Sequence, residues 1–357
     1  MSIELRIGTD ADQKIWDNAI LSSQHGTIFH TWKFLKIVEK HSKMKLIPIM
    51  GVEKDEVFSI FPIFFHKKKF LKLIFSPPPQ MAIPYLGPVI QKYTSLPQYE
   101  LEPQYMEFQK QVDLYIENEI DPDYISITTP PGLTDLRPFI WNGYTSTPFY
   151  NYVIDLHHDE EYLWNQIKNK ARQDITRTQR RGVYVEFGGL DEINLIFEDT
   201  QRRYGEQGLV QNVPKEYITD IYNSFPDNIK LFIARQEKNY ISGHIDLLFN
   251  KKVSSWIGSA KPNIPGIAPN DLLHWEAEKY ALKNGYASYE IIGANTPRLS
   301  SNKIKYGPRP ELYFILKKYT LLGGFVESIY TKFKTTVKSK HFQNLTSIGE
   351  KSKNNET

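Results

Sequence analysis

The chain has 357 residues, 40% of them hydrophobic, and a formal net charge of +3. This length favours two domains, and this hydrophobic share excludes wholesale disorder. The near-neutral charge excludes a general polyanion-binding protein. The lack of cysteine in the sequence excludes disulfides, thiolate zinc sites and a cysteine nucleophile. The longest apolar stretch, 57–65, contains a serine and a proline and is too short to span a bilayer, so we expect a cytoplasmic protein.

The first half of the chain combines short apolar runs with one long helical pattern. Strands are predicted over 45–53, 56–66 and 70–75, and the two residues between the first pair indicate a hairpin. Aromatic and β-branched residues at helical spacing predict a helix over 98–119. A further strand is predicted over 123–129.

The second half repeats this order of elements. The expected strands and helices are, in chain order, a strand at 151–156, a helix at 160–180, a strand at 182–187, helices at 192–204 and 215–224, strands at 229–236, 240–249 and 253–260, a helix at 271–284 and a strand at 287–293. Asn270 or Asp271 is expected to cap the helix at 271–284, and Asn284-Gly285 is expected to end it.

The repeat predicts an α/β fold with mixed sheets, built from two similar units. We expect the first unit over 1–148, the second over 149–320, and a basic amphipathic helix with a frayed tail over 321–357. That helix, over 325–340, either lies on an anionic membrane or packs against the second unit.

Four segments resemble those of a known enzyme family. They are Phe29-His30-Thr31-Trp32; Lys170 to Ile175 followed by Arg181-Gly182-Val183; Trp256-Ile257-Gly258-Ser259-Ala260 followed by Pro269 to Glu276; and Tyr289 to Gly293 followed by Lys303-Ile304-Lys305-Tyr306-Gly307. In these segments the chain resembles the tandem-GNAT acyltransferases. That group includes the Fem peptidoglycan bridge-forming aminoacyltransferases and acetyltransferases of polysaccharide and cell-envelope gene clusters. The resemblance implies two tandem GNAT-like domains, with the donor and catalytic site in the second.

The resemblance also assigns candidate residues. Lys303 falls at the family's functional lysine, and a lysine can stabilise an oxyanion; Asp271 is the second catalytic candidate. The start of the helix at 271–284 should offer free backbone N–H groups to a pyrophosphate. We therefore expect the donor to be bound by Ser259, Ala260, Asn270, Asp271 and Leu272. Substrate binding is expected at Trp32, Lys33, Arg172, Arg181, Trp256 and Tyr306.

Two regions are ambiguous by sequence alone. The basic run at 168–181 is either a solvated face or a grip on phosphate. Glu290, on a predicted strand, could point into a cleft. The nine histidines show no metal-binding spacing, so no metal is expected.

These observations lead to one expected function with two alternatives. We expect an acyltransferase that moves an acetyl or acyl group from acyl-coenzyme A to an amino group of a sugar or peptide in cell-envelope or glycan biosynthesis. The absence of a coiled-coil arm favours acyl-coenzyme A, whereas the absence of the usual Gly-rich coenzyme A loop before the helix favours aminoacyl-tRNA. The expected acceptor is a small or lipid-linked molecule that carries phosphate, met at the inner face of the membrane if the C-terminal helix binds lipid. A non-catalytic module that binds an anionic glycan or nucleic acid is the alternative from another class.

Overall fold

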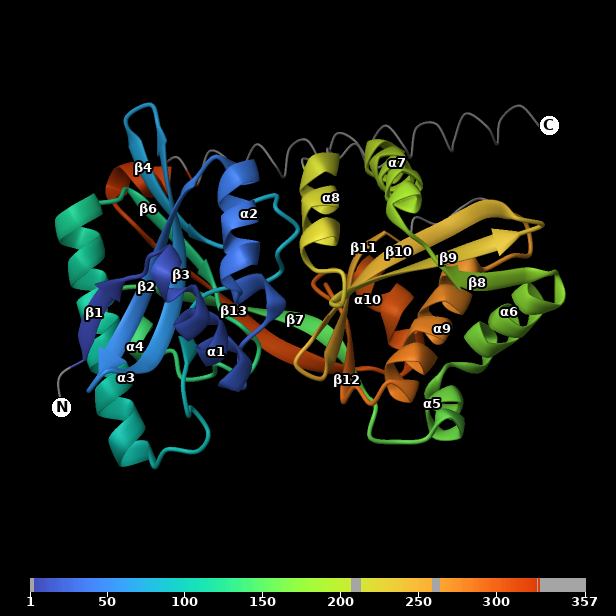
Figure 1. The fold of residues 1–357 in the computed structure, drawn as a ribbon, viewed down its shortest axis with the longest axis horizontal. Helices are drawn as coiled ribbons and strands as arrows, with labels where there is room; N and C mark the ends of the chain where they lie inside the picture. Colours follow the sequence, from blue (N-terminus) through green and yellow to red (C-terminus); the bar gives the residue numbers. More distant parts are fainter. Residues whose placement is uncertain (1–2, 207–212, 259–263, 326, 328–357) are drawn as a thin grey trace, which may run out of the picture.

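The computed structural model describes residues 3–206, 213–258, 264–325 and 327, and in it a single sheet runs through the whole molecule with helices on both faces (Figure 1). The strands of this part of the chain are β1 (Glu4–Ile7), β2 (Lys45–Glu53), β3 (Glu56–Lys68), β4 (Leu71–Ser76), β5 (Val89–Ile90), β6 (Tyr124–Thr128), β7 (Thr145–Asp155), β8 (Val183–Phe187), β9 (Ile229–Gln236), β10 (Asn239–Phe249), β11 (Lys252–Gly258), β12 (Ser288–Ile291) and β13 (Arg309–Tyr319).

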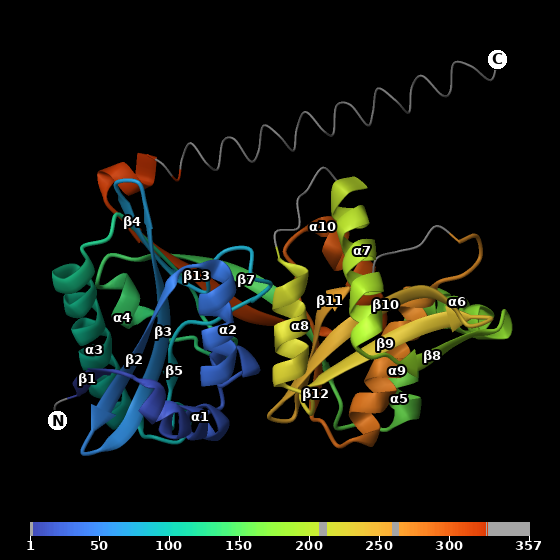
Figure 2. The same cartoon turned by 45° about the horizontal axis from the view of Figure 1, so that its top comes forward.

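The helices divide between the two faces of the sheet. They are α1 (Gln13–Ser22), α2 (Trp32–Ser42), α3 (Gln98–Tyr115), α4 (Arg137–Ile140), α5 (Glu160–Gln166), α6 (Asn169–Arg180), α7 (Leu190–Glu206), α8 (Lys215–Ser224), α9 (Pro269–Lys283) and α10 (Pro297–Lys303). Helices α2 and α8 lie side by side at the centre of the molecule in both cartoon views (Figures 1 and 2). Each belongs to a different repeat, so this contact joins the two units.

The strand order reveals the repeat. It runs β1-β2-β3-β4-β6-β13-β7-β12-β11-β10-β9-β8. In the first unit β1 to β4 are antiparallel neighbours and β4 pairs with β6 in parallel. In the second unit β8 to β11 are antiparallel neighbours and β11 pairs with β12 in parallel. The predicted α/β fold of two similar units is thus confirmed.

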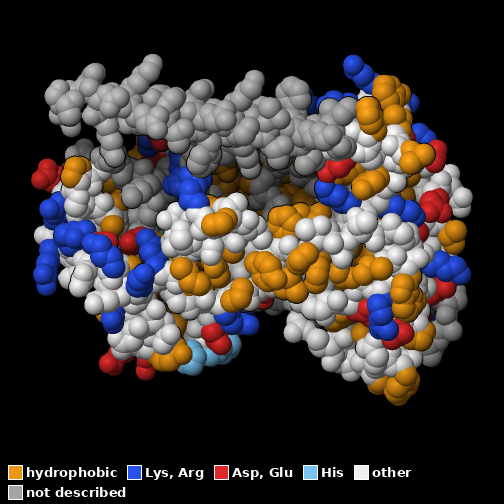
Figure 3. All heavy atoms as spheres, turned by 180° about the vertical axis from the view of Figure 1, so that it is seen from behind, with side chains coloured by type: hydrophobic (Ala, Val, Ile, Leu, Met, Phe, Trp, Pro, Cys, Tyr) orange, Lys and Arg blue, Asp and Glu red, His pale blue; other side chains and the backbone are white. Residues whose placement is uncertain are grey.

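The two units exchange their last strands. β7 follows the first unit in sequence but pairs with β12 of the second, and β13 follows the second unit but pairs with β6 of the first. β7 and β13 also pair with each other and close the sheet at its centre. The expected boundary between residues 148 and 149 falls inside β7. Seen from behind (Figure 3), a band of hydrophobic side chains crosses the middle of the molecule, where these two strands lie.

Three clusters of buried apolar side chains hold the layers together. One lies under α3 in the first unit and one under α9 in the second. The third combines residues of α1 and α2 with residues of α7, α8 and β9 to β11, so it is shared between the units. Polar contacts add to this shared core, because Asp220 of α8 accepts hydrogen bonds from Lys40 at 2.6 Å and His41 at 2.7 Å on α2. The core therefore fixes the second unit against the first.

Most predicted elements are present, with a few differences. The helix expected over 160–180 is two helices, because Ile167 and Lys168 are extended and the Lys168 N–H donates to the Lys305 carbonyl at 2.7 Å. Neither Asn270 nor Asp271 caps α9, whose N-cap residue is Ala268. Gly285 does end the helix, with φ +69°. Elements β1, α1, α2, β5, α4, α10 and β13 were not predicted. Apart from Phe325 and Glu327, the expected helix at 325–340 lies outside the described residues, and none of the helices within them is long and apolar enough to cross a membrane.

Candidate functional site

A cavity of about 870 Å³ lies in the second unit, where β11 and β12 diverge. The ladder between these strands ends at the pair Ser255–Ile291, and both residues line the cavity. The start of α9, the end of α7 and helix α10 form further walls. The remaining wall comes from the first unit, through Gln80, Ala82, Ile83 and Pro84. The site is therefore built by both repeats.

Lys303, the last residue of α10, reaches the cavity beside the end of β12. Its ammonium donates hydrogen bonds to the Ile292 carbonyl and, at 2.7 Å, to the Gly293 carbonyl. An ammonium has three N–H donors, so a third can point into the cavity. Burial, together with the positive charge of Arg203, lowers the pKa of Lys303 to about 8. The side chain is a fixed cation at neutral pH that deprotonates under mildly alkaline conditions.

Asp271 lies in the first turn of α9 and is held by two donors. Its Oδ1 accepts from the Tyr306 hydroxyl at 2.8 Å and from the Lys305 ammonium. Burial and this carboxylate raise the pKa of Tyr306 well above its usual value, so the phenol stays a donor. Because Tyr306 and Lys305 both donate to Oδ1 of Asp271, these contacts hold the carboxylate in the cavity wall.

The start of α9 differs from the sequence expectation. The backbone N–H groups of Asp271 and Leu272 donate to the Ala268 carbonyl at 3.2 and 3.4 Å, and Pro269 has no N–H. The Leu272 side chain is in the apolar core under α9. Asn270 lines the cavity, and its Oδ1 accepts from Ser242 at 2.9 Å. Two of the expected free N–H groups are thus occupied within the helix.

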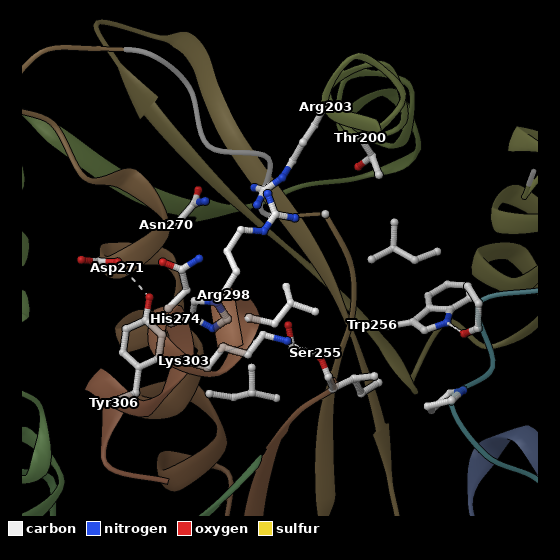
Figure 4. A pocket seen from close by; sticks show the side chains of 18 of the residues that line it. Thr200, Arg203, Ser255, Trp256, Asn270, Asp271, His274, Arg298, Lys303 and Tyr306 are labelled. Carbon is white, nitrogen blue, oxygen red and sulfur yellow. Dashed lines mark hydrogen bonds between the residues drawn. The ribbon is translucent and has the colours of Figure 1, made fainter. Parts of the chain in front are cut away.

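Two arginines that sequence reasoning missed converge in the cavity. Arg203 comes from α7 and Arg298 from α10, and Figure 4 shows their guanidinium groups reaching toward each other above Lys303. Burial, and secondarily the charge of Arg298, lowers the pKa of Arg203. Like charges repel at short range, whereas an anion between them would attract both. With Lys303 they make one side of the cavity suited to phosphate or carboxylate.

The opposite side of the cavity is apolar. Trp256 of β11 lies across the cavity from the arginines in Figure 4, and its indole N–H donates to the Ala82 carbonyl at 2.7 Å. Ile83, Val213 and Ile257, which belong to the same apolar cluster as Trp256, also line the cavity, and so does Pro84. A ligand with a charged end and an apolar end would match the two sides.

His274 forms part of the buried floor between α9 and β12. Its ring lies 4.8 Å from that of Tyr306 and 5.4 Å from that of His244, measured between ring centroids. Burial, followed by the charges of His244 and the lysines at 303 and 305, lowers the pKa of His274 well below its usual value. His274 is therefore neutral at physiological pH.

The other predicted substrate-binding residues lie away from the cavity. Trp32 is buried in the shared core, and its indole N–H donates to Asp10 at 3.0 Å. Lys33 is on the surface and donates to the Ser224 carbonyl at 2.9 Å. Arg172 donates to Asn165 at 2.8 Å, and Arg181 donates to the Pro265 carbonyl at 2.8 Å. None of these four side chains lines the described cavity.

Glu290 does not point into a cleft, in contrast to the sequence-based interpretation. It is fully buried and accepts hydrogen bonds from three side chains. Ser259 and Ala260, expected to bind the donor, lie outside the described residues. Within the described ranges, no cluster of three or more His, Asp or Glu side chains could hold a metal ion.

The sequence of residues 165–297 matches the family model of the acetyltransferase (GNAT) domain. These residues supply β8 to β11, α9 and most of the cavity walls. The second unit is a GNAT acyltransferase domain. This match confirms the expectation from the sequence resemblance that the protein is an N-acyltransferase.

Solved structures extend the GNAT similarity to the whole chain. FemX is similar with a TM-score of 0.67 and 14% identity, over 91% of this chain and 99% of that chain. L-PGS from Bacillus licheniformis follows with a TM-score of 0.54 and 12% identity, over 91% and 97%. A tandem GNAT protein from the clavulanic acid biosynthesis pathway gives 0.51 and 10%, over 89% and 98%. At these identities the likeness shows the fold, which is the Fem-like tandem-GNAT fold. A search of curated proteins by sequence finds no match.

One sequence signal could have identified an arginine of the GNAT domain. Ile193, Ile196 and Thr200 are buried and recur at helical spacing along α7, and Arg203 continues the same stripe. A cation at the end of a buried stripe is unusual on a surface helix. Arg298 and the first-unit segment at 80–84 carry no comparable signal, because only the tertiary fold brings them to the cavity.

Proposed function

We propose that the protein transfers an acyl group from acyl-coenzyme A to an amino group. The observation that carries this proposal is the cavity at the diverging strands of the GNAT domain, which has Lys303 at its floor and Arg203 and Arg298 above it. The arginines would hold the donor's phosphates as charge-assisted hydrogen-bond donors. On this proposal the phosphates are bound by side chains rather than by the start of α9, where the N–H groups of Asp271 and Leu272 donate to the Ala268 carbonyl.

Lys303 would act on the reacting carbonyl. In the reaction with acyl-coenzyme A the acceptor nitrogen bonds to the acyl carbon, the carbon–sulfur bond breaks, and the leaving thiolate takes up the proton that the amine releases. Negative charge develops on the carbonyl oxygen, and the third N–H of Lys303 can donate to it. The two backbone carbonyls that hold the ammonium fix its direction before the substrate binds, so little reorganisation is needed.

An aminoacyl donor is the second candidate. It is favoured by the likeness in fold to a C-terminal domain described as that of a lysylphosphatidylglycerol synthetase, from Agrobacterium fabrum, with a TM-score of 0.54 and 11% identity. The acceptor under either donor is proposed to be a small or lipid-linked molecule that carries phosphate. The charged and apolar sides of the cavity agree with such a molecule.

Ligand protection against heat distinguishes the donors. Acetyl-coenzyme A and charged tRNA are each added to the purified protein, and its Tm is measured. A rise with acetyl-coenzyme A supports the first candidate, and a rise with charged tRNA alone supports the second. Protection by neither, with salt-sensitive binding of nucleic acid or an anionic glycan, would support the non-catalytic module.

A matched pair of variants locates the phosphate grip. Arg203→Gln should raise the donor's Kd about tenfold, since it removes one charged contact. Arg202→Gln is the control, because Arg202 is the adjacent residue of α7 and pairs with Asp199 and Glu206 on the outer surface. Equal Kd values for the two variants would contradict the assignment of Arg203.

A further inference from the structure

A chain of hydrogen bonds connects Lys303 to a buried carboxylate at the junction of the units. The Lys303 ammonium donates to the Gly293 carbonyl at 2.7 Å, and the Gly293 N–H donates to Asn151 Oδ1 at 2.8 Å. Asn151 Nδ2 in turn donates to Glu290 Oε1 at 2.9 Å. Asn151 is on β7 and Glu290 is on β12, and both are fully buried. The backbone at Gly293, which accepts from Lys303, is thus hydrogen-bonded through Asn151 to the exchanged strand β7.

This series of hydrogen bonds ends in the first unit. Glu290 Oε2 accepts from the Tyr85 hydroxyl at 2.7 Å and from Ser254 at 2.8 Å. Tyr85 belongs to the first-unit segment that also walls the cavity, and its ring packs on Phe29 and Tyr313. A buried carboxylate is costly unless several donors satisfy it. Here the donors come from both units.

The carboxylate determines which way the Asn151 amide points. Both oxygens of Glu290 act as acceptors, Oε1 from Asn151 and Oε2 from Tyr85 and Ser254, so the Asn151 NH₂ group faces Glu290. The amide oxygen must then face the Gly293 N–H, and this sets the position of the Gly293 peptide. A neutral partner at position 290 that both donates and accepts could pair with either end of the amide, and the peptide would lose that constraint.

We propose that Asn151 and Glu290 are positioning residues, through which Tyr85 of the first unit aims Lys303 at the reacting carbonyl. The proposal rests on the proposed role of Lys303. It gives the first unit a part in the chemistry of the second, beyond supplying a cavity wall. The backbone of the Gly293 segment is held independently, because the Ala294 N–H donates to the Tyr150 carbonyl at 2.9 Å. Loss of the Asn151 amide should therefore redirect the lysine without detaching the segment.

Two substitutions of different severity test the chain. Asn151→Ala removes the link to Gly293 and should lower kcat roughly tenfold, with KM changed less than about twofold. Tyr85→Phe removes one hydroxyl at the far end and should lower kcat about threefold. Tyr85→Phe keeps the ring and its packing, so it tests the chain even if Asn151→Ala fails to fold.

The control is an equivalent tyrosine outside the chain. Tyr144 is also a buried first-unit tyrosine, and its hydroxyl donates to the buried carboxylate of Asp113 at 2.8 Å. Tyr144→Phe should therefore match Tyr85→Phe in its effect on stability but leave kcat unchanged. Equal kcat values for Tyr85→Phe, Tyr144→Phe and the unaltered protein would overturn the proposal.

A second readout does not depend on turnover. The rate at which Lys303 reacts with acetic anhydride is measured against pH by peptide mass spectrometry, which gives the pKa of the amine directly. Loss of a carbonyl that accepts from the ammonium should lower this pKa by roughly half a unit in Asn151→Ala. The charged and titratable groups that face Lys303, namely Arg203, Arg298 and His274, are the same in both proteins. An unchanged pKa would overturn the positioning role, even if no donor and acceptor for the protein are found.

Discussion

The two units differ in what lies beyond the end of their parallel strand pair. In the first unit the ladder of β4 and β6 ends at Ser76–Ile127. Beyond it, the Leu86 N–H donates to the Thr128 carbonyl at 2.9 Å, and the Gly87 N–H donates to Ser76 Oγ at 3.0 Å. The chain's own backbone thus closes the gap between the strands.

The second unit has a cavity at the corresponding place. Its ladder of β11 and β12 ends at Ser255–Ile291, so Ile292 is the counterpart of Thr128 when the ladders are aligned at their last pairs. The Ile292 carbonyl accepts from the Lys303 ammonium rather than from a backbone amide. In the second unit the donor is the Lys303 ammonium, which has a third N–H for a ligand. In the first unit the donor is the Leu86 peptide group, whose single N–H is already used. The same fold therefore gives one closed unit and one unit with a cavity, and the two differ in the group that donates to this carbonyl.

The largest effect should follow from removing that cation. Lys303→Ala should lower kcat at least about 100-fold, as expected when an oxyanion donor is lost. The Tm should hardly change, because the variant loses two hydrogen bonds but no longer buries a charge. Steady-state kinetics and thermal melting measure the two effects. Lys279→Ala, which breaks a surface ion pair with Glu276, is the control with normal kcat; a Lys303→Ala protein as active as this control would refute the comparison.

The closed gap of the first unit should be sensitive to a single methyl group. Gly87 has φ +70°, and a Cβ there would lie 3.1 Å from both the Thr128 oxygen and the Thr129 Cα. Gly87→Ala should lower the free energy of unfolding by about 2 kcal/mol, from the left-handed backbone and the crowding together. Urea denaturation measures the loss.

The matched control for this change is Gly285→Ala. Gly285 has φ +69°, but no atom lies within 4 Å of its Cβ position. Only the conformational cost of about 1 kcal/mol should appear. If both variants lose the same free energy, crowding at the gap contributes nothing and Gly87 is not a close-packed plug.

The two gaps should also differ in their response to pH. A backbone amide does not titrate in this range, whereas the pKa of Lys303 is lowered to about 8. The ammonium is present below that pH and is lost above it, so kcat should fall about tenfold per pH unit on the alkaline side. The assay needs an acceptor amine that is already unprotonated throughout the range. Lys303→Arg keeps its charge, so an equally steep alkaline decline in that variant would exclude Lys303 as the titrating group.

The smallest effect should come from the wall that the units share. The Trp256 indole N–H holds the Ala82 carbonyl, and Trp256→Phe removes that hydrogen bond while keeping a ring. KM should rise about threefold, with kcat nearly unchanged, since the wall binds the ligand without touching the reacting atoms. A fall in kcat alone would instead indicate that the first-unit segment affects the position of Lys303.

Local patterns predicted the strands and helices whose signals lie within their own sequence. The bounds of β2, α8 and β9 agree with the structure, because each is a clear apolar pattern between turn residues. β13 was not predicted, and its pairing with β6 and β7, which are far away in sequence, has no local signal. The strand exchange is likewise a matter of pairing rather than of propensity, and no local window contains it.

The candidate site was predictable only in part for the same reason. Lys303, Asp271 and Trp256 line the cavity as the resemblance suggested, and so do Asn270 and Tyr306. The roles of these residues remain predictions. Arg203 and Arg298 come from separate helices and meet only in the folded chain. Trp32 was assigned to the substrate from a motif, but its aromatic ring completes the core beside Trp16, 5.4 Å away between ring centroids.

The exchange of β7 and β13 determines when the sheet of the first unit can be completed during synthesis on the ribosome. When the first unit has emerged, the edge of β6 has no partner, because β13 lies near the far end of the chain. An open strand edge is a template for pairing with other chains. That edge stays exposed until residues 149–319 have also been translated, which takes on the order of ten to thirty seconds at the usual rate of elongation. The nascent chain therefore needs protection from aggregation for as long as the second repeat is being made.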